Sequence, residues 1–447
     1  MQAFALKNRA LLLTVFFSIS FSSLAFCSTV QVGGCLSGVP NYTTIGAALA
    51  ILPVEGTIKI CPGNYPEQLL ITKPVNLVGV SSSTGANNPV IVVPTNGLAV
   101  NAHDLYDGSA IAAQIVVQTP AGFTGSIAVN ISNLTFDGNN NNITTCSTDL
   151  VGIYYQSAGG VINHVTMRNH IQPSGYTGCQ GGLAIFAQAG YSVGIPATVT
   201  IENSSIHNFQ KNGITADGDT LTATITGNYV EGRGPVPDNA QNGIQVSDGS
   251  GGKVSGNFVS DIVYVNPPGC TTATCYSATG ILLYDSGGSA GAHIPVNSNL
   301  VSNSQGAIVA VGDASGTADY NDVYSNKIIF TPIAGVYNLD GIDLCSNNDT
   351  ATSNVIMNAS GAGVHIDSSC TESTGTTGNN TAVSKNTIND ACAGVLLGSG
   401  TGSTESADAF YNVIVNTMSG DSCPTGGTSK TFHATNIKLH PSPARKR

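Results

Sequence analysis

A short phrase built around one asparagine recurs ten times along this chain of 447 residues. In each copy an apolar residue stands shortly before the asparagine and another follows it, as in ITGNYVEG at 225–232 and VSGNFVSD at 254–261. The copies are 25 to 42 residues apart, and periods of roughly 20–50 residues are typical of solenoid proteins. The asparagines are Asn133, Asn163, Asn203, Asn228, Asn257, Asn299, Asn326, Asn354, Asn386 and Asn412. The sequence therefore predicts one long solenoid, with insertions between some copies.

A second recurring phrase places a glycine before a short run of alternating apolar residues, as in NGITADG at 212–218, TGILLYDSG at 279–287 and DGIDLCS at 340–346. Such runs suit short strands that cannot bury an apolar side alone, so successive units must stack as parallel sheets around a shared interior. The chain is therefore predicted to be all-β and a parallel β-helix. The recurring asparagine is predicted to occupy a bend with left-handed backbone geometry and to hydrogen-bond the asparagine of the next coil through its amide.

The two ends of the chain differ from the repeats. Residues 1–27 have the features of a secretory signal peptide, with Lys7 and Arg9 ahead of the apolar run 10–17. Thr44 is then expected to begin a short helix in IGAALAIL at 45–52, which would cap the open end of the solenoid. We predict a β-helix over 28–420, with the cap and first coils in 28–100, and a C-terminal cap or tail in 421–447.

Ten of the eleven cysteines lie beyond the signal peptide. An even number of cysteines in an exported chain indicates disulfides. Zinc binding is not favoured, because the sequence contains no CxxC pair. Because neighbours in sequence are neighbours in space in a solenoid, we expect sequential pairing. The predicted pairs are Cys35–Cys61, Cys146–Cys179, Cys270–Cys275, Cys345–Cys370 and Cys392–Cys423.

Charged residues make up only 9% of the chain, and the formal net charge is −11. This acidity argues against nucleic acid as a partner. Beyond the signal peptide, no stretch approaches the roughly 20 apolar residues of a membrane span. We expect an exported monomer, either secreted or extracytoplasmic at the cell surface or in the periplasm.

Residues 42–80, YTTIGAALAILPVEGTIKICPGNYPEQLLITKPVNLVGV, resemble the start of pectinesterase-like right-handed parallel β-helix proteins, including the signature Gly63-x-Tyr65-x-Glu67. The later phrases are similar to the repeats of polysaccharide lyases, polygalacturonases, carbohydrate-binding β-helix proteins and surface proteins. This resemblance to the pectin lyase-like superfamily implies a right-handed β-helix and a polysaccharide partner. One architecture carries many different sites, so the resemblance does not select a reaction.

The catalytic motifs of pectinesterases are absent: the chain has no matching QD pair, no DFIFG-like stretch and no tryptophan. Pectinesterase activity is therefore not expected. Residues 338–343, NLDGID, are similar to the NTDGID stretch of polygalacturonases, whose two aspartates take part in acid–base hydrolysis. The DD pair and GHG segment of that family are missing downstream. The match is thus open to two interpretations, a hydrolase motif or an ordinary repeat with two acids.

Alternation along the glycine strands predicts which side chains leave the coil. If the residue after each glycine points inward, Asp343, His365 and Asp367 point outward on adjacent coils and are our candidate catalytic residues. Tyr154, Gln245, Tyr284 and Asp217 share this face and are the candidate substrate-binding residues. The alternative is that all are ordinary surface residues.

Two loop motifs are weaker candidates. Glu231 and Arg233 could form an acid–base pair or a surface ion pair, and Asp104 with Asp107 could hold calcium or simply form a polar turn. We predict no dedicated metal site, and the one cofactor considered is calcium, as a bridge to an acidic polymer.

The sequence predicts that the protein binds a cell-wall or extracellular polysaccharide in a lateral groove. If it is an enzyme, we expect it to cleave this polysaccharide by hydrolysis or elimination. The alternative is a non-catalytic surface, adhesion or carbohydrate-binding protein whose solenoid is a stalk.

Overall fold

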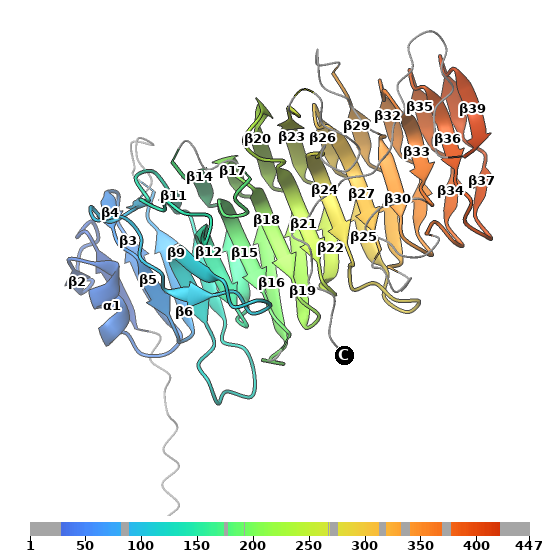
Figure 1. Cartoon of the computed structure of the whole chain (residues 1–447). Coiled ribbons are helices and arrows are strands. Elements are labelled where there is room, and N and C mark those ends of the chain that lie inside the picture. The colour runs from blue at the N-terminus through green and yellow to red at the C-terminus, as the bar shows by residue number, and fades with distance from the viewer. Residues whose placement is uncertain are drawn as a thin grey trace, which may run out of the picture.

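The computed structural model describes residues 28–81, 89–173, 178–191, 193–266, 268, 276–312, 319–331, 340–368 and 377–420. These residues form many short strands stacked into an elongated coil, with the N-terminal strands at one end and the C-terminal strands at the other (Figure 1). The single helix that they include is α1 (Ile45–Ile51). The predicted signal peptide and the predicted C-terminal cap, 421–447, lie outside the described residues.

The strands form three long sheets, called A, B and C here. Sheet A contains β1 (Thr29–Val32), β2 (Asn41–Tyr42), β3 (Gly56–Ile60), β6 (Val75–Gly79), β10 (Val129–Ser132), β13 (Gly160–Asn163), β16 (Ala197–Glu202), β19 (Leu221–Thr226), β22 (Gly251–Ser255), β25 (Ile294–Asn297), β28 (Asn321–Tyr324), β31 (Thr350–Thr352), β34 (Ala382–Ser384) and β37 (Thr404–Ser406). Sheet B contains β4 (Asn64–Pro66), β7 (Val90–Val92), β11 (Thr135–Asp137), β14 (Thr166–His170), β17 (Ser205–Phe209), β20 (Tyr229–Val236), β23 (Phe258–Tyr264), β26 (Leu300–Ser302), β29 (Lys327–Ile329), β32 (Val355–Met357), β35 (Thr387–Asn389) and β38 (Ala409–Tyr411). Sheet C contains β5 (Leu69–Ile71), β9 (Ala110–Gln118), β12 (Thr148–Gln156), β15 (Leu183–Gln188), β18 (Asn212–Asp217), β21 (Asn242–Ser247), β24 (Thr279–Tyr284), β27 (Gly306–Val311), β30 (Ile342–Cys345), β33 (Ala362–Ile366), β36 (Ala393–Leu397) and β39 (Val415–Ser419).

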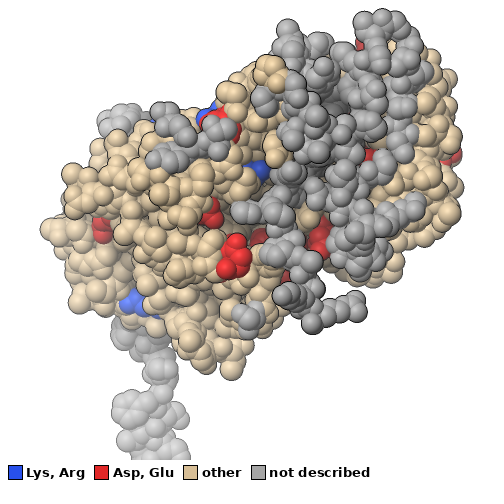
Figure 2. Space-filling model, in the orientation of Figure 1, with Lys and Arg blue, Asp and Glu red and all other residues tan. Residues whose placement is uncertain are grey.

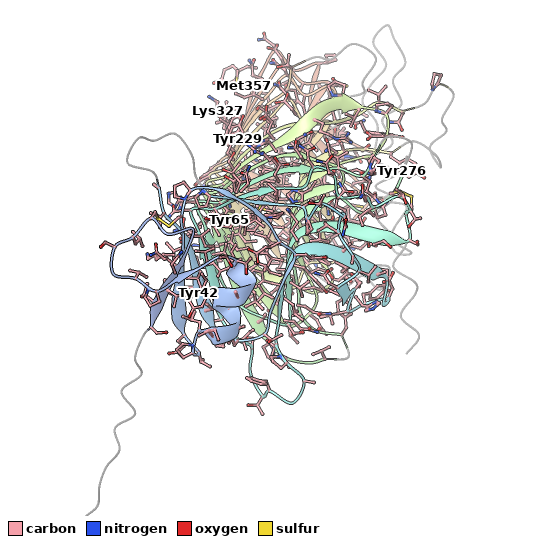
Figure 3. All side chains as sticks on the ribbon, turned by 90° about the vertical axis from the view of Figure 1, so that its left-hand side faces the viewer. Tyr42, Tyr65, Tyr229, Tyr276, Lys327 and Met357 are labelled. Atoms are coloured by element: carbon pink, nitrogen blue, oxygen red, sulfur yellow. A yellow bond between two sulfur atoms is a disulfide. The ribbon has the colours of Figure 1, made fainter. Side chains whose placement is uncertain are left out.

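The strands β1, β2 and β3 all belong to sheet A, and from β3 onward the chain visits sheets A, B and C in turn. Each strand pairs in parallel with the equivalent strand one coil later, as Ile131 of β10 does with Ile162 of β13. The exception is β8 (Ala102–His103), which pairs antiparallel with β9 on sheet C. In Figure 3 the N-terminal end faces the viewer, and Tyr229, Lys327 and Met357 follow one another along the side formed by sheet B. Three parallel sheets wound around one axis confirm the predicted β-helix.

The predicted alternation around the recurring glycines is also confirmed. The residue after each glycine belongs to one continuous buried core, for example Ile214, Ile244 and Ile342. The glycines themselves stack closely: a Cβ added to Gly243 would lie 2.5 Å from the carbonyl oxygen of Gly280 on the next coil. A side chain at this position would therefore push neighbouring coils apart.

An asparagine ladder runs along the turn from sheet A to sheet B. From Asn257 onward, each Oδ1 accepts the backbone N–H and the side-chain amide of the ladder residue one coil earlier, at 2.9–3.0 Å. Each amide also donates to a backbone carbonyl of the preceding coil, at 2.8–3.1 Å. The ladder is buried, ends at Asp408, and consists of Asn228, Asn257, Asn299, Asn326, Asn354 and Asn386.

The two tasks predicted for the recurring asparagine fall on adjacent residues. Left-handed geometry occurs at the residue before each ladder asparagine, for example at Ser325, where φ is 56°. Asn133 and Asn203 occupy this bend position, with φ of 56° and 50°, and Asn163 lies within β13. Asn133 and Asn203 are thus one residue out of register with the ladder. Asn163 comes before the bend at His164, and Asn412 follows β38 and bonds Asn389, so these four asparagines are not ladder members.

The helix α1 begins where the sequence predicts and packs Ile45, Ala48 and Leu49 into the core at the N-terminal end of the coil (Figure 1). Thr44 caps it, and the carboxylate of Glu67 accepts the N–H groups of Ile45 and Gly46 at 2.7 and 2.8 Å. Glu67 of the Gly-x-Tyr-x-Glu signature thus holds the first turn of the helix, where negative charge is favoured. The structural role of the signature is to tie the helix to the first coils.

Two predicted disulfides are present, Cys35–Cys61 and Cys146–Cys179, with Cα–Cα distances of 5.7 and 4.9 Å. Cys345 and Cys392 are also disulfide-bonded. Their predicted partners, Cys370 and Cys423, lie outside the described residues, and so do both cysteines of the predicted pair Cys270–Cys275. Within the described part of the chain, no helix has the length and apolar character to cross a membrane.

Candidate functional site

The outer face of sheet C differs from that of sheet A. In β16 and β19 of sheet A, buried residues alternate with half-buried or exposed ones. In β15, β18 and β27 of sheet C every residue is buried, including those that point away from the coil interior. The outer side chains of these strands of sheet C are therefore enclosed, and an enclosed face can hold a ligand site.

A pocket lies on this face, with a cavity volume of about 210 Å³. Residues 104–109, between β8 and β9, form one wall, and outward side chains of β9, β12, β15, β18, β21 and β24 line the rest. Figure 2 shows acidic side chains gathered around a hollow over β12, β15 and β18. Beneath the pocket, the rings of Tyr154 and Phe186 stack with centroids 5.0 Å apart. An apolar floor under polar walls is the usual composition of a small-molecule or sugar site.

Asp217 accepts hydrogen bonds from three side chains of the pocket region. Its Oδ2 accepts hydrogen bonds from Gln188 Nε2 and the Tyr191 hydroxyl, both at 2.8 Å, and its Oδ1 accepts one from Ser247 at 2.8 Å. These donors come from β15 with the loop that follows it and from β21, so the coils on both sides of β18 fix the orientation of this side chain. Such positioning suits a group that must meet a substrate in one geometry.

Gln188 connects Asp217 to Asp104. The same Nε2 atom donates to Asp217 Oδ2 at 2.8 Å and to Asp104 Oδ1 at 3.2 Å, while Gln188 Oε1 accepts from the Tyr154 hydroxyl at 2.7 Å. Because one nitrogen contacts both carboxyl groups, those two oxygens are at most about 6 Å apart, a limit that admits the roughly 5–5.5 Å of retaining glycoside hydrolases and lies below the range of inverting ones.

Burial changes the protonation of the neighbouring groups. It raises the pKa of Asp104, and the charge of Asp217 adds to this effect, against hydrogen bonds from Gln188 and Tyr106. Burial, with the charges of Asp104 and Asp107, raises the pKa of Asp149 to about 7. The pocket therefore holds carboxyl groups that retain a proton at higher pH than an exposed aspartate does.

One buried base also lines the pocket. Burial lowers the pKa of Lys211 to about 8, and its ammonium group donates to the carbonyl of Ala240 at 2.9 Å. Burial together with nearby carboxylates, chiefly Asp217, raises the pKa of Tyr191 far above its ordinary value. Tyr191 therefore stays a hydrogen-bond donor to Asp217 at any pH at which the protein is used.

Three of the four predicted substrate-binding residues, Asp217, Gln245 and Tyr284, line this pocket. Tyr154 does point outward but is fully buried, since the segment that carries β8 folds over it and its hydroxyl bonds Gln188. Its ring packs against Phe186 and offers no face to a sugar. Alternation predicted the outward direction of the Tyr154 side chain correctly, but it could not reveal that the segment carrying β8 covers it.

The predicted catalytic trio lies farther along sheet C. Asp343 and His365 are direct partners across β30 and β33, and Asp367 follows β33. All three are buried, with exposures of 4%, 2% and 1%, where alternation alone predicts an open sheet surface. His365 Nδ1 lies 3.0 Å from Asp340 Oδ2, so its charged partner comes from the segment before β30. The pocket does not include the trio.

Sequence reasoning missed several residues of the pocket: Asp149, Gln188, Tyr191 and Lys211. For Asp104 and Asp107 the sequence suggests calcium binding or a polar turn, and Asp104 does accept the N–H of Tyr106 at 2.7 Å in such a turn. The link between this turn and β15 spans more than 80 residues and has no local signal. The other predicted motif, Glu231 with Arg233, is not in a loop but in β20, and Arg233 forms its ion pair with Asp238 at 2.8 Å where the sequence suggested Glu231.

No protein-family model matches the chain, and no curated protein matches it by sequence. Solved structures do match. A GH136 lacto-N-biosidase from Eubacterium ramulus superposes with a TM-score of 0.56 and 10% identity, covering 86% of this chain and 67% of that one. PfbA, a surface adhesin of Streptococcus pneumoniae, gives 0.42 and 14%, covering 83% and 86%. The mannuronan C-5 epimerase AlgE4 A-module of Azotobacter vinelandii gives 0.36 and 14%, covering 83% and 90%.

The superposition on the lacto-N-biosidase concerns the architecture alone, since only 10% of the residues are identical. Together with the three continuous parallel sheets, it shows that this chain is a right-handed parallel β-helix protein.

Proposed function

We propose that the protein is an exported glycoside hydrolase that binds a glycan on the outer face of sheet C and cleaves it in the pocket under residues 104–109. The observation that carries this proposal is the pair Asp104 and Asp217, held close together by the amide of Gln188. The two groups are held differently: Asp104 is buried with a raised pKa, while both carboxyl oxygens of Asp217 accept side-chain hydrogen bonds, and we assign them different chemical roles on this basis.

In this mechanism protonated Asp104 donates its proton to the glycosidic oxygen, and the Asp217 carboxylate attacks the anomeric carbon. Water then hydrolyses the glycosyl–enzyme bond, with Asp104 accepting a proton from that water. The limit of about 6 Å between their oxygens is below the separation of roughly 6.5–9.5 Å with which inverting enzymes make room for a water molecule, so in this proposal Asp217 itself attacks. The product is therefore expected to retain the anomeric configuration of the substrate.

The remaining lining residues would position the glycan. Gln245 and Tyr284 extend the pocket along the coil axis toward β24, where further sugar units would lie. We propose export because two disulfides are formed within the described coils and such bonds persist in oxidising compartments. In the same proposal one β-helix domain spans 28–420 and α1 shields its first coil from solvent.

The test is turnover of a panel of neutral and acidic polysaccharides and oligosaccharides by the mature protein, with and without calcium, measured as reducing ends. Asp217→Asn and Asp104→Asn should each lower kcat by at least about 1,000-fold with little change in thermal stability. Asp390→Asn, at an exposed bend, is the matched control and should leave turnover unchanged. NMR of the first product should show retained anomeric configuration.

The same experiment decides between two sites and two classes of protein. Loss of turnover in Asp343→Asn or Asp367→Asn, with normal turnover in Asp217→Asn, would transfer catalysis to the trio predicted from the sequence. Binding of a glycan without turnover by the wild type would instead make the protein a carbohydrate-binding or adhesion module.

A further inference from the structure

A column of outward side chains on sheet C contains two titratable residues among apolar ones. Register places Leu282, Val309, Asp343, His365 and Leu396 opposite one another on five successive coils. All five are at most 4% exposed. A carboxylate and an imidazole in such surroundings are costly to bury unless their charge is compensated.

A third residue joins this pair from the same face. Asp340, which is 5% exposed, directs Oδ2 to His365 Nδ1 at 3.0 Å and accepts the backbone N–H of Ala362 with Oδ1. Potential ligand atoms of Asp340, Asp343 and His365 all lie within 4.8 Å of one another. None of these residues belongs to the pocket proposed as the active site.

Geometry favours a cation at this position, because two carboxyl groups and one imidazole converge on one point from two adjacent coils. Ligands that share one ion at about 2.0–2.2 Å are separated by up to roughly 4 Å, so a small inward movement of these side chains would suffice. Adjacent strands of a sheet lie about 4.8 Å apart, which holds Asp343 and His365 at this separation.

We propose that Asp340, Asp343 and His365 form a binding site for a divalent first-row transition metal ion such as Zn²⁺ or Mn²⁺. One nitrogen and two carboxylate ligands match these ions, whereas Ca²⁺ takes six to eight oxygen ligands and Mg²⁺ keeps several waters. The ion would join β30 to β33, two coils away from the end of the pocket at β24. Its expected effect is to stabilise these coils.

The test uses the full-length mature protein after treatment with a chelator. Titration calorimetry with ZnCl₂ and MnCl₂ should show one site per chain, and thermal unfolding should move to higher temperature with the metal. CaCl₂ and MgCl₂ should bind at least about 100-fold more weakly. His365→Gln and Asp343→Asn should each weaken Zn²⁺ binding by at least about 10–100-fold, the range typical for disturbance of a metal site.

The matched control is His293→Gln. His293 Nδ1 also lies 3.0 Å from a carboxylate, Asp322 Oδ2, but both side chains are partly exposed, at 37% and 28%. This variant and Asp217→Asn should bind Zn²⁺ as the wild type does. Absence of Zn²⁺ and Mn²⁺ binding by the wild type would overturn the proposal, whether or not the variants fold. Loss of Zn²⁺ binding in either control, with binding kept in His365→Gln, would overturn it as well.

Discussion

Replacing one member of the asparagine ladder should destabilise the protein far more than replacing a neighbouring surface asparagine. In the wild type, Asn326 Oδ1 accepts the backbone and side-chain N–H groups of Asn299, both at 3.0 Å. Its amide donates to the carbonyl of Val296 at 2.8 Å and to Asn354 Oδ1 at 3.0 Å. Asn326→Ala removes all four hydrogen bonds at a side chain that is 1% exposed.

The magnitude follows from the burial of these groups. A hydrogen bond contributes about 1 kcal/mol net, and the four bonds together about 4 kcal/mol. The backbone N–H of Asn299 loses its acceptor in the interior, so the substitution also leaves an unsatisfied polar group. Asn297→Ala, two residues from the ladder, removes a half-buried side chain with one weak contact to Ser298 and should cost less than about 0.5 kcal/mol.

Urea unfolding followed by far-ultraviolet circular dichroism would measure both free energies of unfolding. Native-state hydrogen exchange would locate the effect, because in a solenoid each coil contacts mainly its neighbours. The amides of Asn299 and of the adjacent coils should lose protection first. Equal stability of Asn326→Ala and Asn297→Ala would refute the conclusion that the ladder holds the coils together.

Three further predictions concern other parts of the coil. Gly243→Ala places a methyl group against the carbonyl of Gly280 and should cost about 1–3 kcal/mol in urea unfolding; a neutral result would show that the coils can separate freely. Joint replacement of Cys146 and Cys179 by serine opens a cross-link of 33 residues and should lower stability by roughly 3–4 kcal/mol, with the β signal retained in circular dichroism at room temperature. The pKa of Asp149 in the folded protein is about 7, above its ordinary value of 3.8, so the free energy of unfolding falls as pH rises from about 4 through 7. Asp149→Asn should therefore raise Tm above that of the wild type at pH 8 and not at pH 4. An equal change in Tm at both pH values would contradict the raised pKa.

The sequence by itself determined the architecture, because the features that specify a β-helix are local and repeated. Alternation over a few residues is enough to orient Ile342 toward the interior and Asp343 away from it. The glycine phrase recurs in successive coils, so the same orientation is repeated along sheet C. The nearest-neighbour nature of a solenoid also made sequential cysteine pairing a sound prediction for Cys35–Cys61 and Cys146–Cys179. The loose phrase located the ladder but not its register, since a bend residue and a ladder residue are one position apart.

Only the tertiary structure decided which outward residues are enclosed and which meet one another. Asp104 and Asp217 are far apart in sequence and become neighbours because the segment around β8 folds back over the outer face of sheet C. The same is true of the pairing of His365 with Asp340, which depends on how the chain enters β30. Alternation fixes the direction of a side chain, whereas burial, pKa and partners depend on what packs above the sheet, and that information lies in long-range contacts rather than in any local pattern.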